Sequence, residues 1–175
     1  MSTAPEPRAA TAAPVNRDAF RAAVGRFATG ITVVTTRAYG VDHAMTVNSL
    51  TSVSLDPVLA LFCAERIARF HDAVAASGHW AVSILGADAE WVSRRLAHRG
   101  RPLAGQLDGI PHAPGPHTGA AVLDCAIGVL ECRTRVVYDG GDHTIVLGDV
   151  LAASASPGAA QPLLHYQGSY RGLSG

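Results

Sequence analysis

Hydrophobic and polar residues follow the two-residue period of β-strands along much of this chain. Residues 31–36 are all β-branched, and an extended pattern resumes over 41–47 after Tyr39 and Gly40, which predicts a hairpin. A turn is expected at 54–57 because proline restricts the residue before it. The continuous apolar run 58–63 then predicts a strand that is buried on both faces.

The second half of the chain continues the strand pattern. Residues 79–85 alternate, and two long strands are expected over 122–137 and 143–152. Asp139-Gly140-Gly141-Asp142 between them is a strong hairpin turn. One further short strand is expected within 161–171.

Three short segments have helical features instead. Asn16 is placed to cap a helix that presents Phe20, Val24 and Phe27 and stops at Gly30. A second helix is expected over 68–76, ended by Ser77 and Gly78. Asp88 is expected to cap a third, which runs to about Ala97.

These elements do not alternate regularly as strand and helix, and no GxGxxG follows a strand. The pattern favours a single antiparallel barrel over a doubly wound sheet. We expect one domain over 16–175 and a disordered Ala/Pro-rich arm over 1–15. The Gly-, Pro- and His-rich stretch 100–119 is expected to be a long loop that serves as a lid or a cofactor wall.

Composition narrows the function classes. The net charge is zero and the chain has no lysine, with its arginines scattered among acidic residues, so a nucleic-acid partner is not expected. The sequence shows no export signal and no apolar stretch long enough to span a membrane, so we expect a cytoplasmic protein without membrane contact. Its three cysteines are an odd number, and we expect them to be reduced thiols. A zinc site is disfavoured because Cys125 and Cys132, if they lie on one strand, would face opposite sides of it. A hydrolase is disfavoured because the sequence has no GxSxG motif.

Polar side chains gather where the first hairpin ends. Thr46, Asn48 and Ser49 lie within one short span, and hydroxyl, amide and backbone N–H groups can hold a phosphate in a protein without lysines. The same residue types are also common at strand edges and turns. Spacing alone leaves both interpretations open.

The motifs around this segment resemble a known family. Residues 45–49 and 51–57 are similar to the signature of the flavin reductase-like family, and 141–145, 162–166 and 168–171 match its later motifs. The resemblance spans about residues 16–172 and implies a mainly β fold. That fold is the FMN-binding split β-barrel, an antiparallel Greek-key barrel with a few peripheral helices.

The resemblance also implies an activity. Members similar to this chain are NAD(P)H:flavin oxidoreductases that reduce FAD, or FMN, with NADH, or NADPH. They deliver diffusible reduced flavin to a partner monooxygenase and pair as homodimers. The alternative, on the same barrel, is a non-catalytic flavin- or haem-binding module.

Site residues follow from the motifs. His143 is expected to contact the nicotinamide as the catalytic residue, although an isolated histidine is also often structural. No metal ligand is expected. The residues expected to bind the cofactors are Thr46, Val47, Asn48, Ser49, Ser52, Val53, Ser54, Phe62, Cys63, Ala64, Arg69, Phe70, His71, His143, Tyr166 and Tyr170.

These residues have separate expected roles. Thr46 to Ser54 would hold the flavin phosphate arm, and Val53 with 62–64 would form a slot for the ring, unless the latter residues are simply barrel core. Arg69 and His71 would meet the pyrophosphate at a helix start, or form a solvated helix face. Tyr166 and Tyr170 would stack on nicotinamide or adenine, or close a barrel or dimer seam. The chain departs from the family at Ile67 and Phe70, where many members have a small hydroxyl residue.

Overall fold

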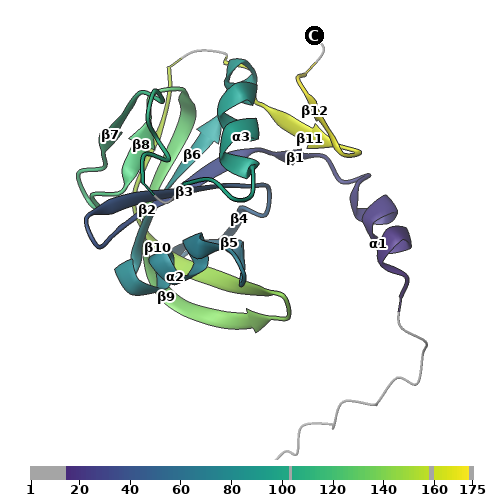
Figure 1. Cartoon of the computed structure of the whole chain (residues 1–175), viewed down its shortest axis with the longest axis horizontal. Helices are drawn as coiled ribbons and strands as arrows, with labels where there is room; N and C mark the ends of the chain where they lie inside the picture. The colour runs from purple at the N-terminus through teal and green to yellow at the C-terminus, as the bar shows by residue number, and fades with distance from the viewer. Residues whose placement is uncertain (1–14, 103, 158–159, 174–175) are drawn as a thin grey trace, which may run out of the picture.

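The computed structural model describes residues 15–102, 104–157 and 160–173. Seven antiparallel strands form one sheet in the order β3-β2-β6-β9-β10-β5-β4 (Figure 1). Its two edge strands, β3 and β4, are consecutive in the chain, yet within the described ranges they do not pair with each other. The sheet is therefore a barrel that remains split between them, which confirms the fold that the motifs implied.

The bounds of the elements are as follows. The helices are α1 (Arg17–Val24), α2 (Arg69–Ser77), the 3₁₀ turn η1 (Ala87–Ala89) and α3 (Glu90–Ala97). The strands are β1 (Thr29–Gly30), β2 (Thr32–Ala38), β3 (Val41–Val47), β4 (Thr51–Leu55), β5 (Val58–Glu65), β6 (His79–Leu85), β7 (His112–Pro114), β8 (Ala121–Leu123), β9 (Ala126–Gly140), β10 (His143–Ala155), β11 (Leu164–Tyr166) and β12 (Ser169–Arg171).

Two hydrophobic clusters lie on opposite faces of β2. Inside the barrel, Val34 packs with Trp80, Phe62 and the α2 residue Phe70. On the other face, Val33 belongs to a cluster that α3 covers. Both faces of β2 are therefore buried, which explains its continuous β-branched sequence. α2 and α3 flank β3, which places two helix ends beside the open seam (Figure 1).

The predicted burial of β5 is wrong on one side. Ala60, Phe62 and Ala64 point into the barrel and are buried, while Leu61 and Cys63 on the other face are only half-buried. An apolar run does not by itself reveal which of its faces a neighbour covers. Ser54, expected in the turn before this strand, belongs to β4 instead.

Two helix boundaries also differ from the prediction. Asn16 caps α1 as expected, but α1 ends at Val24 with Gly25 as its C-cap, and Gly30 lies in β1. Asp88 caps no helix, because it lies in η1 and the residue before α3 is Ala89. A 3₁₀ turn that precedes an α-helix displaces the cap position in this way.

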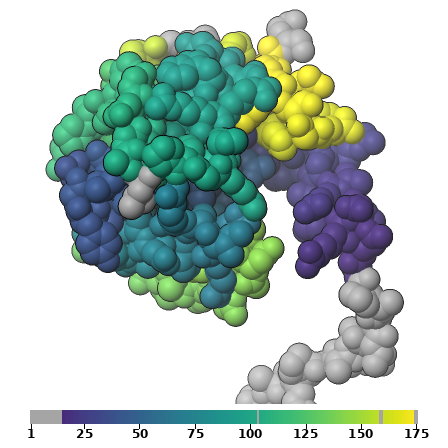
Figure 2. Space-filling view, in the orientation of Figure 1, coloured from purple at the N-terminus to yellow at the C-terminus, as the bar shows by residue number. Residues whose placement is uncertain are grey.

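The later strands are divided more finely than the pattern suggested. A turn at Asp124 and Cys125 separates β8 from β9, so Cys125 and Cys132 do not share a strand. The C-terminal segment forms two strands, β11 and β12, joined at Gln167 and Gly168, whose φ angles are both positive. Figure 2 shows this hairpin beside α1 on one side of the barrel.

The predicted N-terminal arm falls, but for Val15, outside the described residues. Among the helices that the structure describes, none has the length and apolar character needed to span a membrane.

Candidate functional site

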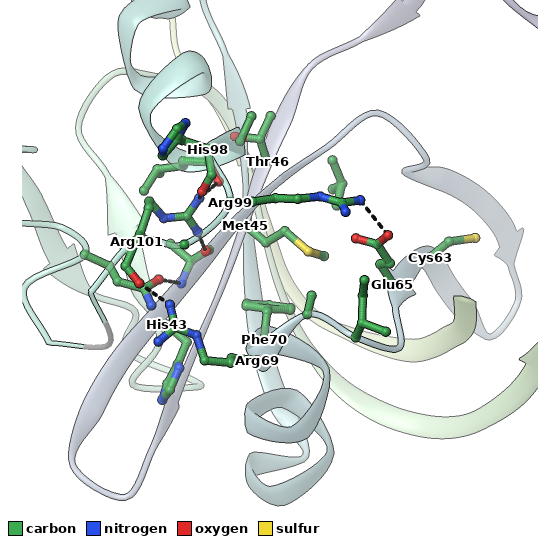
Figure 3. Close-up of a pocket in the computed structure, with 18 of the residues that line it drawn as sticks. His43, Met45, Thr46, Cys63, Glu65, Arg69, Phe70, His98, Arg99 and Arg101 are labelled. Carbon is green, nitrogen blue, oxygen red and sulfur yellow. Dashed lines mark hydrogen bonds and ion pairs between the residues drawn. The ribbon is translucent and has the colours of Figure 1, made fainter. Parts of the chain in front are cut away.

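The main cavity lies at the split in the barrel and has a volume of about 460 Å³. β3 and the residues after it form one wall, the end of β5 with the start of α2 forms the second, and the end of α3 with 98–101 forms the third (Figure 3). This volume is within the usual range for cofactor and small-molecule sites.

Half of the residues predicted to bind cofactors line this cavity. Those that line it are Thr46, Val47, Asn48, Ser49, Cys63, Arg69, Phe70 and His143. Those that the structure does not bring to it are Ser52, Val53, Ser54, Phe62, Ala64, His71, Tyr166 and Tyr170.

The hydroxyls of the predicted cradle are partly engaged in holding the wall together. Thr46 Oγ1 donates a hydrogen bond to Ser93 O at 2.9 Å, which ties β3 to α3. Ser49 Oγ accepts a hydrogen bond from Cys63 N at 3.0 Å and so joins the two sides of the seam. Exposed Asn48 lies between them. This end of the cavity therefore presents a fixed set of small polar groups.

The opposite end is cationic. Arg69 Nη2 donates to Arg101 O, and Arg101 Nη2 donates to Ala44 O at 2.8 Å. Burial, then the nearby charges of Arg69 and Arg95, lower the pKa of Arg101. Within the described part of the chain, none of these three arginines forms an ion pair with a carboxylate. The site thus holds uncompensated positive charge.

His43 adds a buried imidazole to the cationic end. Its side chain lies beside Arg69 in Figure 3 and is nearly inaccessible to solvent. Burial is the largest cause of its lowered pKa, against which the backbone of Ala38 acts. His43 Nδ1 and Arg101 Nε are buried without a hydrogen-bond partner among the described residues. Unpartnered polar atoms at a cavity are what a polar ligand would satisfy.

One ion pair crosses the cavity. Arg99 Nη2, from the segment after α3, lies 2.6 Å from Glu65 Oε1 at the end of β5 (Figure 3). Arg99 is mostly exposed and Glu65 is about one-third exposed. Exposed pairs contribute little free energy, so a ligand can displace this contact at low cost.

His143 stands at the edge of the cavity, at the first position of β10. Its Nδ1 lies 2.7 Å from Asp142 Oδ1, and this hydrogen bond is the largest cause of the lowered pKa of Asp142. The contact occupies Nδ1 and leaves Nε2 as the nitrogen that can reach a ligand.

Several residues that were predicted to bind the cofactors instead pack in the core or tie secondary-structure elements together. Phe62 and Ala64 are fully buried in the barrel core, so only Cys63 of the proposed ring slot reaches the cavity. His71 Nε2 is 2.9 Å from Thr144 Oγ1 and ties α2 to β10. Tyr170 Oη is 2.8 Å from Ser93 Oγ, which places it behind the wall that Thr46 forms.

Besides His98, the sequence reasoning missed five polar or charged residues that line the cavity. They are His43, Glu65, Arg99, Arg101 and Gln106. The predicted role of the stretch 100–119 as a wall fits only its first part, because Gly100, Arg101 and Gln106 line the cavity and its other described residues do not. The signal in the sequence that could have indicated this wall is the pair of arginines that flank Gly100, in a protein without lysines.

Comparison with known proteins agrees with the fold. The family model "Flavin reductase like domain" matches residues 24–174. The chain therefore belongs to the flavin reductase-like family, and by its relatives it is a flavin reductase.

Three similar proteins make this more specific. An NADH-dependent FAD reductase of Streptomyces globisporus is 38% identical over 172 residues, which cover 98% of this chain and 93% of that protein. The reductase subunit HsaB of a flavin-dependent monooxygenase of Mycobacterium tuberculosis is 34% identical over 92% of this chain and 84% of that one. The solved structure of the S. globisporus NADH:FAD oxidoreductase SgcE6 with NAD and FAD fragments has a TM-score of 0.86 and 37% identity, covering 95% of this chain and 98% of that chain.

The residues of the cavity fit a flavin. Met45 and Ile67 give an apolar wall for a flat ring system, and the hydroxyls and N–H groups near Ser49 suit its polar edge. The arginines at the other end suit a phosphate. Apolar and charged ends in one cavity match a ligand with a ring at one end and phosphate at the other.

Proposed function

We propose that this protein reduces FAD or FMN with NADH and releases the reduced flavin to a separate monooxygenase. The observation that carries the proposal is the family match over residues 24–174, together with a polar-to-cationic cavity at the split of the barrel. The relatives named above are an NADH-dependent FAD reductase and a monooxygenase reductase subunit.

The chain's own residues bind and orient the reactants. The sequence predicted Thr46, Asn48 and Ser49 on the phosphate arm, but in this proposal they hold the polar edge of the flavin. Arg69 and Arg101 meet the phosphate instead, because they supply positive charge at the other end of the cavity. His143 Nε2 hydrogen-bonds the nicotinamide carboxamide, and Asp142 holds the imidazole in place through Nδ1. Hydride transfer is the chemistry that the two bound cofactors supply. The protein contributes proximity and alignment of the two rings.

The protein works as a homodimer in this proposal. α1 buries none of its residues, although Phe20 and Val24 lie on it and Phe27 follows it, all well exposed. On the barrel, Leu55 is exposed beside β5, whose outer face is half-buried, and Tyr138 is exposed on β9. Large exposed apolar side chains on a helix that buries none of its residues are typical of an interaction site. A second copy of the chain covers it, and light scattering that gives the mass of a single chain at micromolar concentration would contradict this.

The partner that consumes the product is a flavin-dependent monooxygenase, of which this chain is the reductase component. Its reaction serves natural-product biosynthesis or aromatic hydroxylation. The protein acts in the cytoplasm, where its three free cysteines remain reduced.

The proposal is tested by turnover. Purified protein with NADH and either FAD or FMN should oxidise NADH, and the reduced flavin should pass to cytochrome c without contact between the proteins. A semipermeable membrane between the enzyme and cytochrome c distinguishes diffusible flavin from a bound one. Retention of flavin or haem without NADH oxidation would instead indicate a binding module and refute the proposed reductase.

A further inference from the structure

A second hollow adjoins the main cavity and shares His98, Arg101 and Gln106 with it. It has a volume of about 450 Å³, and its remaining lining includes Arg94, Arg95 and Pro102. Arg101 therefore lines both hollows and stands where a ligand that occupied the two together would pass from one to the other.

The junction is built from buried and ordered groups. Arg101 Nη1 donates to His98 O at 2.7 Å, and Nη2 donates to Ala44 O at 2.8 Å. Gln106 is buried, and its Oε1 accepts a hydrogen bond from Ala44 N at 3.0 Å. These contacts fix Arg101 in place, yet its Nε is buried without a partner in the part of the chain that the structure describes. Nη2 carries a second N–H beside the one that Ala44 accepts, and a guanidinium held in one orientation with a further donor is suited to bind an oxyanion.

The two arginines of the second hollow are not equivalent. Arg94 is occupied: its Nε lies 2.7 Å from Glu90 Oε1, and its guanidinium stacks on the Tyr170 ring at 4.7 Å. Arg95 has no carboxylate within ion-pair distance among the described residues, although Asp108 lies against Gly105 at the rim. Arg95 is close enough to Arg101 for its charge to contribute to the lowered pKa of Arg101. An anion between these two cations would be attracted to both of them.

We infer that this second hollow binds the adenylate half of FAD, with Arg101 on the pyrophosphate and Arg95 on the adenosine side. The inference rests on the proposed function and names the flavin that the site prefers. FMN ends at its first phosphate, which Arg69 and Arg101 can meet inside the main cavity. Only FAD continues beyond Arg101, where planar guanidinium groups can stack on its adenine. The protein should therefore discriminate FAD from FMN through Arg95.

Three flavins and two variants separate these contributions. Arg95→Gln should raise the KM for FAD by about fivefold, as expected for loss of one partly exposed charge contact, and leave the KM values for FMN and riboflavin unchanged. Arg69→Gln should raise the KM for both FAD and FMN but not for riboflavin, which has no phosphate. Arg37→Gln is the matched control, because Arg37 forms an exposed ion pair with Asp42 outside both hollows and should change none of the three values.

Each other outcome overturns the inference. An equal rise for FMN and FAD in Arg95→Gln would place that residue on the shared phosphate, and an unchanged KM for FAD would place the adenylate elsewhere. A rise confined to the KM for NADH would assign the hollow to the nicotinamide dinucleotide. If the wild-type protein oxidises no NADH with any flavin, the proposed function fails separately. Fluorescence titration of FAD and FMN on wild type and Arg95→Gln then decides the inference by affinity alone.

Discussion

The best-defined buried charge in the molecule lies outside the active site, on β9. Glu131 is 4% exposed, and its Oε2 accepts hydrogen bonds from His117 N at 3.0 Å, Thr118 N at 2.9 Å and Thr118 Oγ1 at 2.8 Å. A Cβ on Gly115 would lie 2.3 Å from the same oxygen, so the loop closes tightly around the carboxylate. Glu131 therefore fixes the end of the stretch 100–119, which the sequence predicted to be one long loop but which contains the strand β7.

Replacement of Glu131 by alanine removes the acceptor of all three donors. A hydrogen bond to a charged group contributes about 1.5–3 kcal/mol, and the three share one oxygen, so we expect a loss of about 3–4 kcal/mol in the free energy of unfolding. For a chain of this length that corresponds to a fall in Tm of about 10 °C. Glu131→Gln keeps one acceptor oxygen without the charge and should lose about half as much.

Urea titration followed by circular dichroism measures this effect. The KM for flavin should stay unchanged in both variants, because Glu131 does not line the cavity. A loss below about 0.5 kcal/mol in Glu131→Ala, the range of ordinary surface substitutions, would refute the reasoning. So would a Gln variant that is as unstable as the Ala variant.

Three further predictions concern the core, the pH dependence and the site. Gly148→Ala should cost about 2 kcal/mol in urea titrations, because its Cβ would lie 2.5 Å from Trp80 Cζ2, and Trp80→Phe in the same chain should recover part of the loss. His43 has a lowered pKa in the folded state, so its neutral form stabilises the folded protein fully above about pH 6.5, and this contribution is lost as pH falls towards the folded pKa. In unfolding titrations over that pH window, the free energy of unfolding of His43→Gln should fall less than that of the wild type. His143→Ala should raise the KM for NADH by about tenfold and leave that for flavin unchanged in steady-state assays, and a rise for flavin instead would reject its nicotinamide role.

The sequence predicted most strands because their periodicity is local. β2 and β3 are joined as expected, since a β-branched run followed by Tyr39 and Gly40 needs no distant information. The outer face of β5 was misjudged because Leu61 has the same sequence signature whether or not a neighbour covers it. The cap of α3 was misplaced because Asp88 fits a cap and a 3₁₀ turn equally well.

The site shows the same division between local and distant information. Thr46, Asn48 and Ser49 are adjacent in the chain, so their motif indicated one wall of the cavity. His43 and Arg101 meet only because α3 returns the chain over β3, and no spacing in the sequence encodes that approach. The contiguous end of the site was predictable, and the end assembled from separate elements was not.

Ile67 and Phe70 offer no hydroxyl group to a phosphate, which bears on how the proposed site would hold one. Phe70 is 5% exposed, and its ring packs edge-on against that of Phe62 with 6.2 Å between the ring centroids, so this side chain belongs mainly to the core. Ile67 is 78% exposed but has no polar group in its side chain. In the proposed function, Arg69 and Arg101 therefore hold the phosphate by charge instead of by hydroxyl groups. Salt screens charge contacts at a partly exposed site. The KM for FMN should therefore rise severalfold when the ionic strength is raised from about 0.01 to 0.5 M, while the KM for riboflavin should not change. Equal salt dependence for the two flavins, measured in parallel assays, would show that these arginines do not bind the phosphate.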